Sequence, residues 1–375
     1  MVHGKPTLED VEMSFEFWLK KRVLITGHTG FKGGWLSLWL QSLGAEVIGY
    51  SLPPPTTPSL FFQTAVEQDM RSVLGDVRDL QHLRKVVEES KPEVIFHLAA
   101  QSLVRSSYVD PVGTYATNVL GTTNVLETVR ENAAVRSVVI VTTDKCYENS
   151  EDGRAYRETD RLGGFDPYSS SKAAAELVTA AFRNSFFSPA NGKVQQGIAS
   201  ARAGNVIGGG DWAADRLIPD VMRAVCDGEE VSIRNPDSIR PWQHVLEPLF
   251  GYLILAERLH SRPGRYAEAW NFGPDDSDGL PVSAVLQLLS RSWGRGIHWR
   301  IDEAPQVHEA GRLRLDSSKS RQMLGWQPQW KLDQALQATA QWYKAYQNQQ
   351  DLRAITLQQI ESYQSALTMS KGILE

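Results

Sequence analysis

Short runs of hydrophobic residues alternate with longer amphipathic stretches through the first half of the chain. The short runs predict buried strands, and the stretches in which hydrophobic positions recur every three or four residues predict helices. The predicted strands are Arg22–Thr26, Glu46–Tyr50, Ser72–Leu74, Glu93–Leu98, Ser137–Thr142 and Gly197–Arg202. The predicted helices are Gly33–Leu43, Leu80–Ser90, Thr114–Asn132 and Tyr168–Phe187. This alternation indicates a parallel sheet, because parallel strands require long crossover connections.

The pattern changes beyond about Asn205. Consecutive glycines from Gly208 predict a loop, and prolines interrupt the sequence after it, at Pro219, Pro236, Pro241 and Pro248. Isolated strands and late helices are predicted at Glu230–Ile233, Trp270–Phe272, Ser283–Ser292, Ser317–Leu324 and Leu332–Gln347. We therefore expect an α/β fold, with a Rossmann-type doubly wound parallel sheet over residues 18–205 and a smaller, mixed α/β substrate lobe over residues 206–375. The boundary is expected to be interleaved, and residues 1–17 to form an N-terminal extension.

Composition restricts the class of protein. With 42% hydrophobic and 22% charged residues, the chain has the composition of an ordinary globular protein, and its net charge of −5 argues against a nucleic-acid-binding surface. Cys146 and Cys226 are the two cysteines and lie far apart, so we expect neither a disulfide framework nor a metal site. No stretch has the pattern of a signal peptide or a membrane span, so we expect a cytoplasmic protein without a membrane partner.

Glycines 27, 30 and 33 follow the first predicted strand and precede the first predicted helix. At this junction a glycine-rich loop permits a tight turn, a close approach to a pyrophosphate and close helix–strand packing. Its position at the first strand–helix junction favours a dinucleotide site over an ordinary turn. We expect the cofactor to contact the following loop residues: Gly27, Thr29, Gly30, Phe31 and Lys32.

The residues after the second and third strands bear on the type of cofactor. An NAD site usually has an acidic residue after the second strand, but Tyr50 and Ser51 stand there. This keeps NADP open beside NAD, with Lys32 as a candidate partner of a 2′-phosphate. Asp76 and Val77 follow the third strand, where Asp76 can meet the adenine or instead cap the helix that begins near Leu80.

Tyr168 and Lys172 are four residues apart in a predicted helix, so they share one face. A tyrosine has a pKa near 10 and is a poor base at neutral pH. A nearby ammonium, together with an oxidised nicotinamide, stabilises the phenolate and lets it take a proton from an alcohol. The alternative is an exposed helical pair, but the glycine loop upstream favours the catalytic interpretation.

Thr143, Asp144 and Lys145 follow the fifth predicted strand. In open α/β sheets, reactive groups gather at the carboxyl ends of the strands. Asp144 and Lys145 can reach one substrate only if the chain has already left the strand, because neighbouring strand residues point to opposite faces. We therefore predict a turn here. The alternative is a surface ion pair at a strand end.

Several motifs resemble the extended short-chain dehydrogenase/reductase superfamily. They are the glycine loop, His97–Gln101, Thr117–Thr122 and the pair Tyr168 and Lys172. Four longer segments resemble the CDP-glucose 4,6-dehydratase family in particular: Gly30–Trp35, Thr143–Asn149, Arg202–Trp212 and Arg240–Pro248. The likeness extends from about Trp18 to Tyr343, which is most of the chain.

The resemblance implies a mechanism for a bound sugar nucleotide. Tyr168, helped by Thr143, would take the 4-OH proton while hydride leaves C4, and Asp144 would protonate the departing 6-OH. Lys145 would remove the C5 proton, with Glu148 as the alternative base. Related dTDP- and GDP-sugar dehydratases have a glutamate in place of Lys145, whereas the CDP-glucose family has lysine. Hydride return to C6 would give a 4-keto-6-deoxy sugar and regenerate NAD.

The resemblance also implies binding residues. Leu98, Ala99 and Ala100 would join the glycine loop, Tyr168 and Lys172 around NAD. The expected substrate-binding residues are Gln101, Asn205, Arg216, Arg234, Arg240 and His244. Arginines suit a diphosphate because a guanidinium can bind it bidentately, although each can equally form a surface ion pair. Trp212 and Trp242 can stack on a base or simply pack in the core.

Two other functions stay open. A sugar-nucleotide 4-epimerase, a decarboxylase or another sugar-nucleotide dehydratase would keep Tyr168 and Lys172 on the same fold, and a non-catalytic NAD(P)-sensing protein is a remote alternative. By analogy with the superfamily we expect a homodimer or homotetramer, with Thr114–Asn132 and Tyr168–Phe187 at a two-fold interface.

Overall fold

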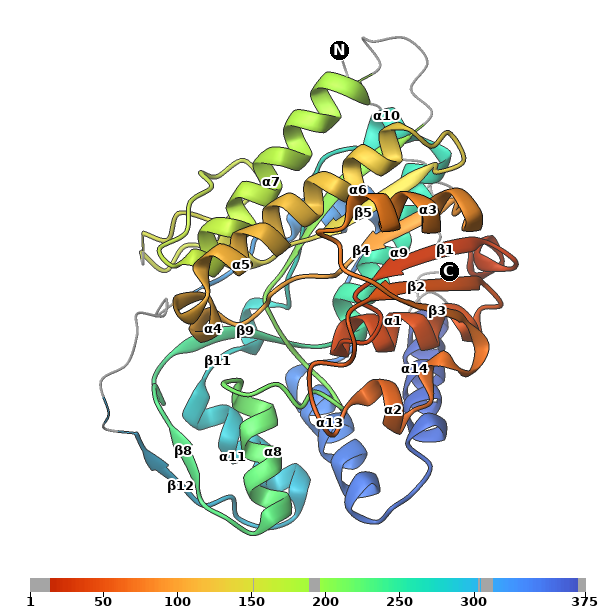
Figure 1. The fold of residues 1–375 in the computed structure, drawn as a ribbon. Helices are drawn as coiled ribbons and strands as arrows, with labels where there is room; N and C mark the ends of the chain where they lie inside the picture. Colours follow the sequence, from red (N-terminus) through yellow and green to blue (C-terminus); the bar gives the residue numbers. More distant parts are fainter. Residues whose placement is uncertain (1–13, 151, 189–195, 303, 305–312, 370–375) are drawn as a thin grey trace.

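A computed structural model describes residues 14–150, 152–188, 196–302, 304 and 313–369. The main sheet has seven parallel strands in the order β10-β6-β5-β4-β1-β2-β3 (Figure 1). Its strands are β1 (Arg22–Thr26), β2 (Glu46–Ser51), β3 (Arg71–Leu74), β4 (Val94–His97), β5 (Ser137–Val141), β6 (Gly197–Ala203) and β10 (Ala269–Phe272). The predicted Rossmann-type parallel sheet is confirmed, with strand ends within a residue or so of the expected positions.

Helices cover both faces of this sheet. One face packs against α1 (Phe31–Ser42) and α9 (Leu246–Ser261), and the other against α3 (Leu80–Ser90), α6 (Gly121–Arg130) and α7 (Pro167–Phe186). Alternate residues of β1 point to opposite faces of the sheet: Val23 and Ile25 pack in the hydrophobic cluster on one face, and Leu24 packs in the cluster on the other. In Figure 1, α6 and α7 run side by side across their face. The sheet is therefore doubly wound.

The second lobe contains two small sheets. One has the order β11-β9-β7 and the other pairs β12 with β8. These strands are β7 (Asn205–Ile207), β8 (Val231–Ile233), β9 (Ile239–His244), β11 (Gly279–Pro281) and β12 (Trp299–Ile301). The surrounding helices are α8 (Leu217–Asp227), α11 (Val282–Trp293), α12 (Ser318–Leu324) and α13 (Leu332–Gln347). Between these pieces the chain returns to the main sheet through α9, α10 (Pro263–Tyr266) and β10.

The sequence suggested that four prolines of the second half interrupt regular structure, but two of the four lie within helices. Pro219 and Pro248 are the third residues of α8 and α9. The first amides of a helix have no intrahelical partner, so a proline there costs no hydrogen bond. The C-terminal helix α14 (Leu352–Met369) was also not predicted, and it packs against α1 and α13.

The predicted helix Thr114–Asn132 is divided by a wider turn. It consists of α5 (Pro111–Tyr115), a π-helical turn over Ala116–Leu120 and α6. The short helices α2 (Leu60–Gln63) and α4 (Val104–Val109) complete the described helices of this half. Within the π turn, Asn118 donates to the Ser171 hydroxyl at 2.8 Å and thereby joins this turn to α7. A π turn at such a position often accompanies a functional site.

No helix in the described residues is both long and apolar enough to cross a membrane. Of the predicted N-terminal extension, residues 1–13 lie outside the described part of the chain. Trp18, which follows it, is fully buried against Phe96.

Glu247 is a buried carboxyl group in the first turn of α9. It accepts hydrogen bonds of 2.7 Å from the Trp330 amide and from the Tyr363 hydroxyl. Burial raises the pKa of Glu247 from 4.5 to about 7, although these hydrogen bonds act in the opposite direction. The folded chain therefore holds this proton more tightly than the unfolded chain does.

We expect the contribution of Glu247 to stability to fall with rising pH. Because its folded pKa is raised, the contribution is complete below the unfolded pKa and is lost as pH rises through about 7, a loss approaching about 3 kcal/mol. Glu247→Gln should remove this dependence, since an amide can accept from Trp330 and donate to Tyr363 without ionising. The free energy of unfolding in urea, measured for the parent and for Glu247→Gln at about pH 5 and about pH 8, tests this prediction. If the free energies of unfolding of variant and parent differ by the same amount at both pH values, the prediction is contradicted.

Candidate active site

A cavity of about 790 Å³ lies at the carboxyl ends of the main-sheet strands and extends to the second lobe. Residues after β1 to β6 line one side, and residues of the second lobe, among them Arg234, Arg240 and Trp242, line the other. This is the place where open α/β sheets bind ligands.

The glycine loop forms a cradle at the start of α1. Gly27 has a φ of +80°, and a Cβ added to it would lie 2.7 Å from the amide nitrogen of Ala99. A Cβ on Gly33 would lie 2.1 Å from the Gly27 carbonyl oxygen. Neither position has room for a side chain, and Gly30 caps the helix whose first amides face the cavity. This arrangement fits a dinucleotide pyrophosphate.

All the residues predicted to bind the cofactor line this cavity. They are Gly27, Thr29, Gly30, Phe31, Lys32, Asp76, Val77, Leu98, Ala99, Ala100, Tyr168 and Lys172. At the end of β2, where an acid is absent, the Thr29 and Ser51 hydroxyls are 2.8 Å apart. Hydroxyls therefore occupy the place at which an adenine ribose is usually recognised.

Lys32 is not placed as a partner for a 2′-phosphate. Burial lowers its pKa to about 7, and the groups with the largest further effect are Arg216 and Lys172, which lower it, and Asp144, which raises it. These neighbours stand at the catalytic end of the cavity, not beyond β2. The charges that act on Lys32 therefore lie at the end of β5, at the start of α7 and just before α8, and the structure does not favour Lys32 as the candidate partner of a 2′-phosphate.

Asp76 does not cap α3. Asp79 is the capping residue and accepts from the His82 amide at 3.0 Å. Asp76 instead accepts two hydrogen bonds from the Arg78 guanidinium, from Nε at 2.9 Å and from Nη2 at 2.5 Å. This bond to Arg78 holds the pKa of Asp76 below its usual range, so the carboxylate is charged where it lines the cavity.

Tyr168 and Lys172 occupy the first turns of α7. The helix begins there because Asp166 accepts from the Ser169 amide at 2.9 Å and Pro167 follows it. Burial raises the pKa of Tyr168 to about 12, while a hydrogen bond with Thr143 and the charge of Arg216 lower it. Lys172 donates to the Val141 carbonyl at 3.1 Å, and burial lowers its pKa to about 8. The Tyr168 phenol thus lies between the end of β5 and Lys172, whose pKa is close to neutral pH.

The chain turns immediately after β5, as predicted. The strand ends at Val141, and a 3-10 turn over Asp144–Cys146 follows. The Thr143 hydroxyl donates to Asp144 Oδ1 at 2.9 Å, and Lys145 Nζ lies 3.6 Å from the same oxygen. Asp144 and Lys145 therefore meet on one side of the backbone.

Asp144 lies behind the wall of the cavity, whereas Thr143 and Lys145 line it. Asp144 is 1% exposed, and its Oδ2 has no hydrogen-bond partner in the described part of the chain. A Cβ on Gly204 would lie 3.3 Å from this oxygen, and Gly204 does line the cavity. A glycine at this position keeps the space beside Oδ2 open.

Glu148 is not placed to act as a base. Its side chain is 56% exposed and pairs with Arg161 at 3.2 Å. It is not among the residues that line the cavity. Of the two bases considered, only Lys145 lines the cavity.

Four of the six predicted substrate-binding residues line the cavity: Asn205, Arg216, Arg234 and Arg240. Arg216 also pairs with Asp211 at 3.0 Å, and Arg234 with Asp215 at 3.2 Å. Carboxylates thus hold two of the guanidinium groups at the cavity wall.

Gln101 and His244 are placed elsewhere. The Gln101 amide donates at 3.0 Å to both Leu103 and Thr114, so it stabilises its own loop. His244 is fully buried among Trp35 and Trp330, and burial lowers its pKa to about 3. Neither side chain lines the cavity, in contrast to the other four.

Several lining residues were not predicted. They include Ser51–Pro53, Ser102–Arg105, Thr117, Asp211, Asp215 and Ser232. Trp212 and Trp242 do line the cavity, but their indole nitrogens donate to Gln63 and to the Leu280 carbonyl, so both rings are also fixed by packing. Most of these positions lie in loops whose path has no periodic signal.

Comparison with known proteins gives a consistent result. A family model described as GDP-mannose 4,6 dehydratase matches residues 24–261. The CDP-glucose 4,6-dehydratase of Salmonella typhimurium is 51% identical over 353 residues, covering 94% of this chain and 98% of the relative. DesIV, a dTDP-glucose 4,6-dehydratase from Streptomyces venezuelae solved with NAD and TYD bound, has a TM-score of 0.72 and 26% identity, covering 88% of this chain and 98% of that one. The UDP-glucose 4-epimerase of Thermotoga maritima shares the fold at 20% identity, with a TM-score of 0.74 and coverage of 87% and 99%.

Proposed function

This chain belongs to the GDP-mannose 4,6-dehydratase family, and we propose that it converts CDP-glucose to CDP-4-keto-6-deoxyglucose. The observation that carries the proposal is that two chemical units meet at the wall of one cavity, with Asp144 directly behind it. Tyr168 and Lys172 suit alcohol oxidation, and Asp144 and Lys145 suit elimination. The Salmonella relative, at 51% identity, supports CDP-glucose as the substrate.

The cofactor is NAD, which when bound supplies the acceptor for the C4 hydride and the donor that returns it to C6. The glycine cradle and the helix α1 would hold its pyrophosphate. Residues 18–205 form most of this cofactor side in our proposal, and residues 206–375 most of the sugar-nucleotide side, with β10 and α9 interleaved. Arg216, Arg234 and Arg240 would bind the substrate diphosphate.

In this proposal, one residue accepts or donates the proton in each transfer of the oxidation and elimination steps. Tyr168, as a phenolate that the hydrogen bond with Thr143 stabilises, takes the 4-OH proton and becomes a neutral phenol. The new C4 ketone acidifies the C5 proton, which passes to Lys145 Nζ. Asp144 donates a proton to the departing 6-OH through Oδ2, so C5 and C6 lose one water in total.

A panel of CDP-, dTDP-, GDP- and UDP-sugars tests the proposal. We expect a 4-keto-6-deoxy product, identified by mass and by its chromophore in alkali, from CDP-glucose in preference to the others. A 4-epimer without loss of water would establish the epimerase instead. Cofactor binding without turnover of any sugar nucleotide would favour a sensing role.

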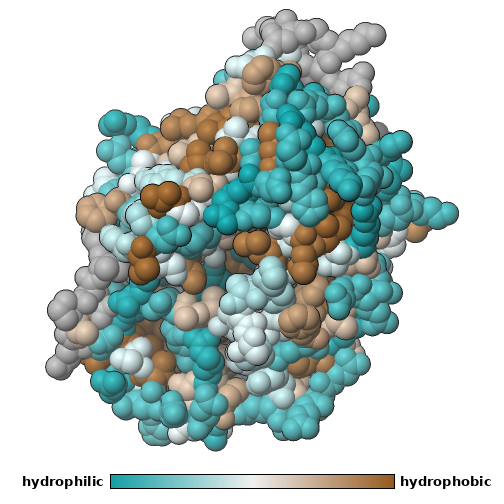
Figure 2. Space-filling view, viewed as in Figure 1, coloured by the Kyte–Doolittle hydropathy of each residue, from teal (hydrophilic) through white to brown (hydrophobic). Residues whose placement is uncertain are grey.

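We also propose that two copies of the chain associate through α5, the π turn and α7. Hydrophobic side chains are exposed here, with Val112 78%, Leu120 49%, Leu177 60% and Phe186 51% exposed. Hydrophobic patches lie over this part of the face in Figure 2. A second copy can cover them, and a tetramer would need a further contact. The two described cysteines are free thiols, which suits our proposed cytoplasmic location.

Replacing Val112 and Leu177 by lysine should therefore produce a monomer. Two charges would have to be buried in the interface, whereas in the monomer both positions face solvent. Analytical ultracentrifugation of the parent and the double variant measures the change. Exposed Leu19, in the turn before β1 and outside α5, the π turn and α7, provides the matched control Leu19→Lys, which should leave the mass unchanged. A double variant with the parent mass would contradict the interface.

A further inference from the structure

A buried ion pair lies directly behind the catalytic residues of α7. Glu176 is one helical turn beyond Lys172, which is itself one turn beyond Tyr168. Its Oε2 is 2.8 Å from Nη2 of Arg202 on β6, and the two side chains are 2% and 3% exposed. Neither residue lines the cavity.

Glu176 binds the segment that leads into the acid–base residues. Its Oε1 accepts a hydrogen bond from the Thr142 hydroxyl, and its Oε2 accepts another from Ser200 at 2.6 Å. Thr142 immediately precedes Thr143, Asp144 and Lys145. One carboxylate therefore connects the helix of the oxidising pair to the start of the turn that carries the eliminating pair.

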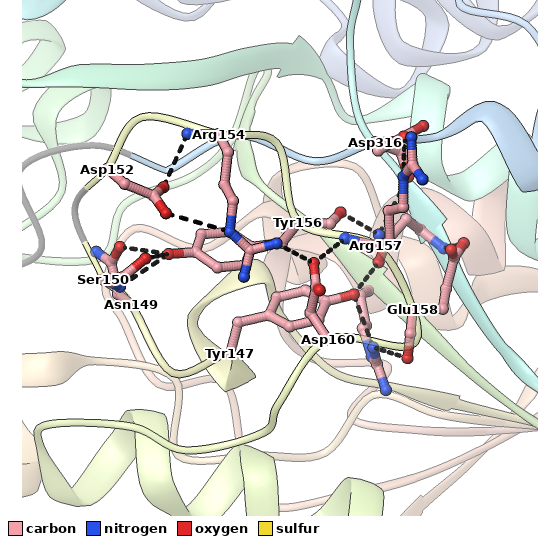
Figure 3. A network of polar contacts seen from close by, with 12 residues as sticks. Tyr147, Asn149, Ser150, Asp152, Arg154, Tyr156, Arg157, Glu158, Asp160 and Asp316 are labelled. Atoms are coloured by element: carbon pink, nitrogen blue, oxygen red, sulfur yellow. Dashed lines mark hydrogen bonds and ion pairs between the residues drawn. The ribbon is translucent and has the colours of Figure 1, made fainter.

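Arg202 binds the other end of the same turn. Its Nη1 donates to the Tyr147 hydroxyl at 2.7 Å, and its guanidinium lies 4.9 Å from the centre of the Tyr147 ring. Tyr147 in turn donates to Asn271 at 2.8 Å and stacks on Tyr156 with ring centres 5.1 Å apart. Figure 3 shows these two rings within the polar contacts of the loop that follows the turn.

The polar contacts continue from Tyr156 into the second lobe. The Tyr156 amide donates to the Arg314 carbonyl at 2.9 Å, and Arg157 pairs with Asp316 at 2.8 Å. In Figure 3, Arg157 and Asp316 lie at one end of this set and Asn149 and Ser150 at the other. The loop is therefore fixed on both sides of Tyr147.

Stability alone does not explain a pair at this depth. Burial would raise the pKa of Glu176, but the Arg202 charge and three hydrogen bonds hold it below its usual range, so both groups stay charged. A buried ion pair often contributes less stability than well-packed hydrophobic residues of the same volume. Its hydrogen bonds, however, fix direction and distance.

We infer that Glu176 and Arg202 form a positioning pair that holds the segment Thr142–Tyr147 at both ends and sets it against Tyr168 and Lys172. This inference rests on the proposed dehydratase function, since it assigns one structural cause to two chemical steps. A displacement of the turn would move Thr143 away from Tyr168 and move Asp144 and Lys145 away from the sugar. Oxidation and elimination should therefore weaken together, while binding of the nucleotide part persists.

Three variants test the pair. Glu176→Gln removes the charge, whereas Thr142→Val and Tyr147→Phe each remove a single connection to the ion pair and keep the shape of the side chain. Tyr147→Phe also removes the hydrogen bond to Asn271. We expect kcat to fall by about 100-fold for Glu176→Gln and about 10-fold for each of the others, because displacements of about 1 Å cost this much, with KM for CDP-glucose within about twofold of the parent. Glu176→Asp, which keeps the charge, should recover part of the loss.

Glu247→Gln and Tyr363→Phe are the matched controls, since they change an equally buried carboxyl and tyrosine that do not line the cavity. They should change the unfolding midpoint without lowering kcat. If Glu176→Gln does not fold, the two single-connection variants carry the test. Parental kcat in both of them would overturn the inference, as would losses in KM alone. Failure of the unmodified enzyme to convert any sugar nucleotide would instead overturn the proposed function.

Discussion

Tyr168→Phe should lower both product formation and reduction of the bound cofactor by about 10²–10⁴-fold, the usual contribution of a positioned general base. The ring is buried, so phenylalanine keeps the packing and removes only the hydroxyl that bonds to Thr143. Without it, the 4-OH loses the proton acceptor that is hydrogen-bonded to that threonine. Oxidation is the first step, so no later step can be observed either.

Stopped-flow absorbance of reduced nicotinamide, with CDP-glucose in excess, measures this step directly. Tyr363→Phe is the control for loss of a buried tyrosine hydroxyl and should behave as the parent enzyme does. A normal rate of cofactor reduction in Tyr168→Phe would show that another group takes the proton.

Lys145→Ala should have the opposite effect on cofactor reduction: the cofactor should still be reduced, but elimination should be slowed. Tyr168 and Lys172 are intact in this variant, so C4 is still oxidised, but the C5 proton has no acceptor. Reduced cofactor should accumulate to about the enzyme concentration while water loss slows by about 10²–10⁴-fold. The substitution also removes the amine that lies 3.6 Å from Asp144 Oδ1, and Asp144 stays buried beside Thr143.

Absorbance and product mass, recorded on the same sample, separate the two steps. Lys319→Ala is a matched control, because Lys319 pairs with Glu268 away from the cavity. Full turnover by Lys145→Ala would remove Lys145 from the mechanism. Loss of turnover without any cofactor reduction would place its role in binding or oxidation instead.

The sequence predicts the main sheet well because nearly all of its strands are runs of buried residues followed by a recognisable turn; the edge strand β3, whose residues are half-buried or exposed, is the exception. Helices α8 and α9 were missed for a local reason, since Pro219 and Pro248 resemble breaks but occupy first turns. The strands β7 and β11 have only three residues each and pair with β9 across long separations in the sequence, so no periodic pattern marks them.

The site was predictable where spacing alone brings residues together. A four-residue interval places Tyr168 beside Lys172, and a strand end places Thr143 opposite them. The same interval continues to Glu176, which is the signal that would have drawn attention to the buried pair. Gln101, His244 and Lys32 were assigned from their place in a motif, and a motif does not determine the direction of a side chain. Local partners did so instead: Leu103 and Thr114 for Gln101, two tryptophans for His244, and the charges near Asp144 for Lys32.

The return of the chain to the main sheet at β10 has a consequence for how such enzymes diversify. The sugar-facing wall is built as two excursions from the sheet, one between β6 and α9 and one after β10. Neither excursion interrupts a pairing of the seven strands or the glycine cradle. Each can therefore be exchanged between homologous genes with the redox machinery left whole, so that a new sugar or base can be acquired in two separate recombination events.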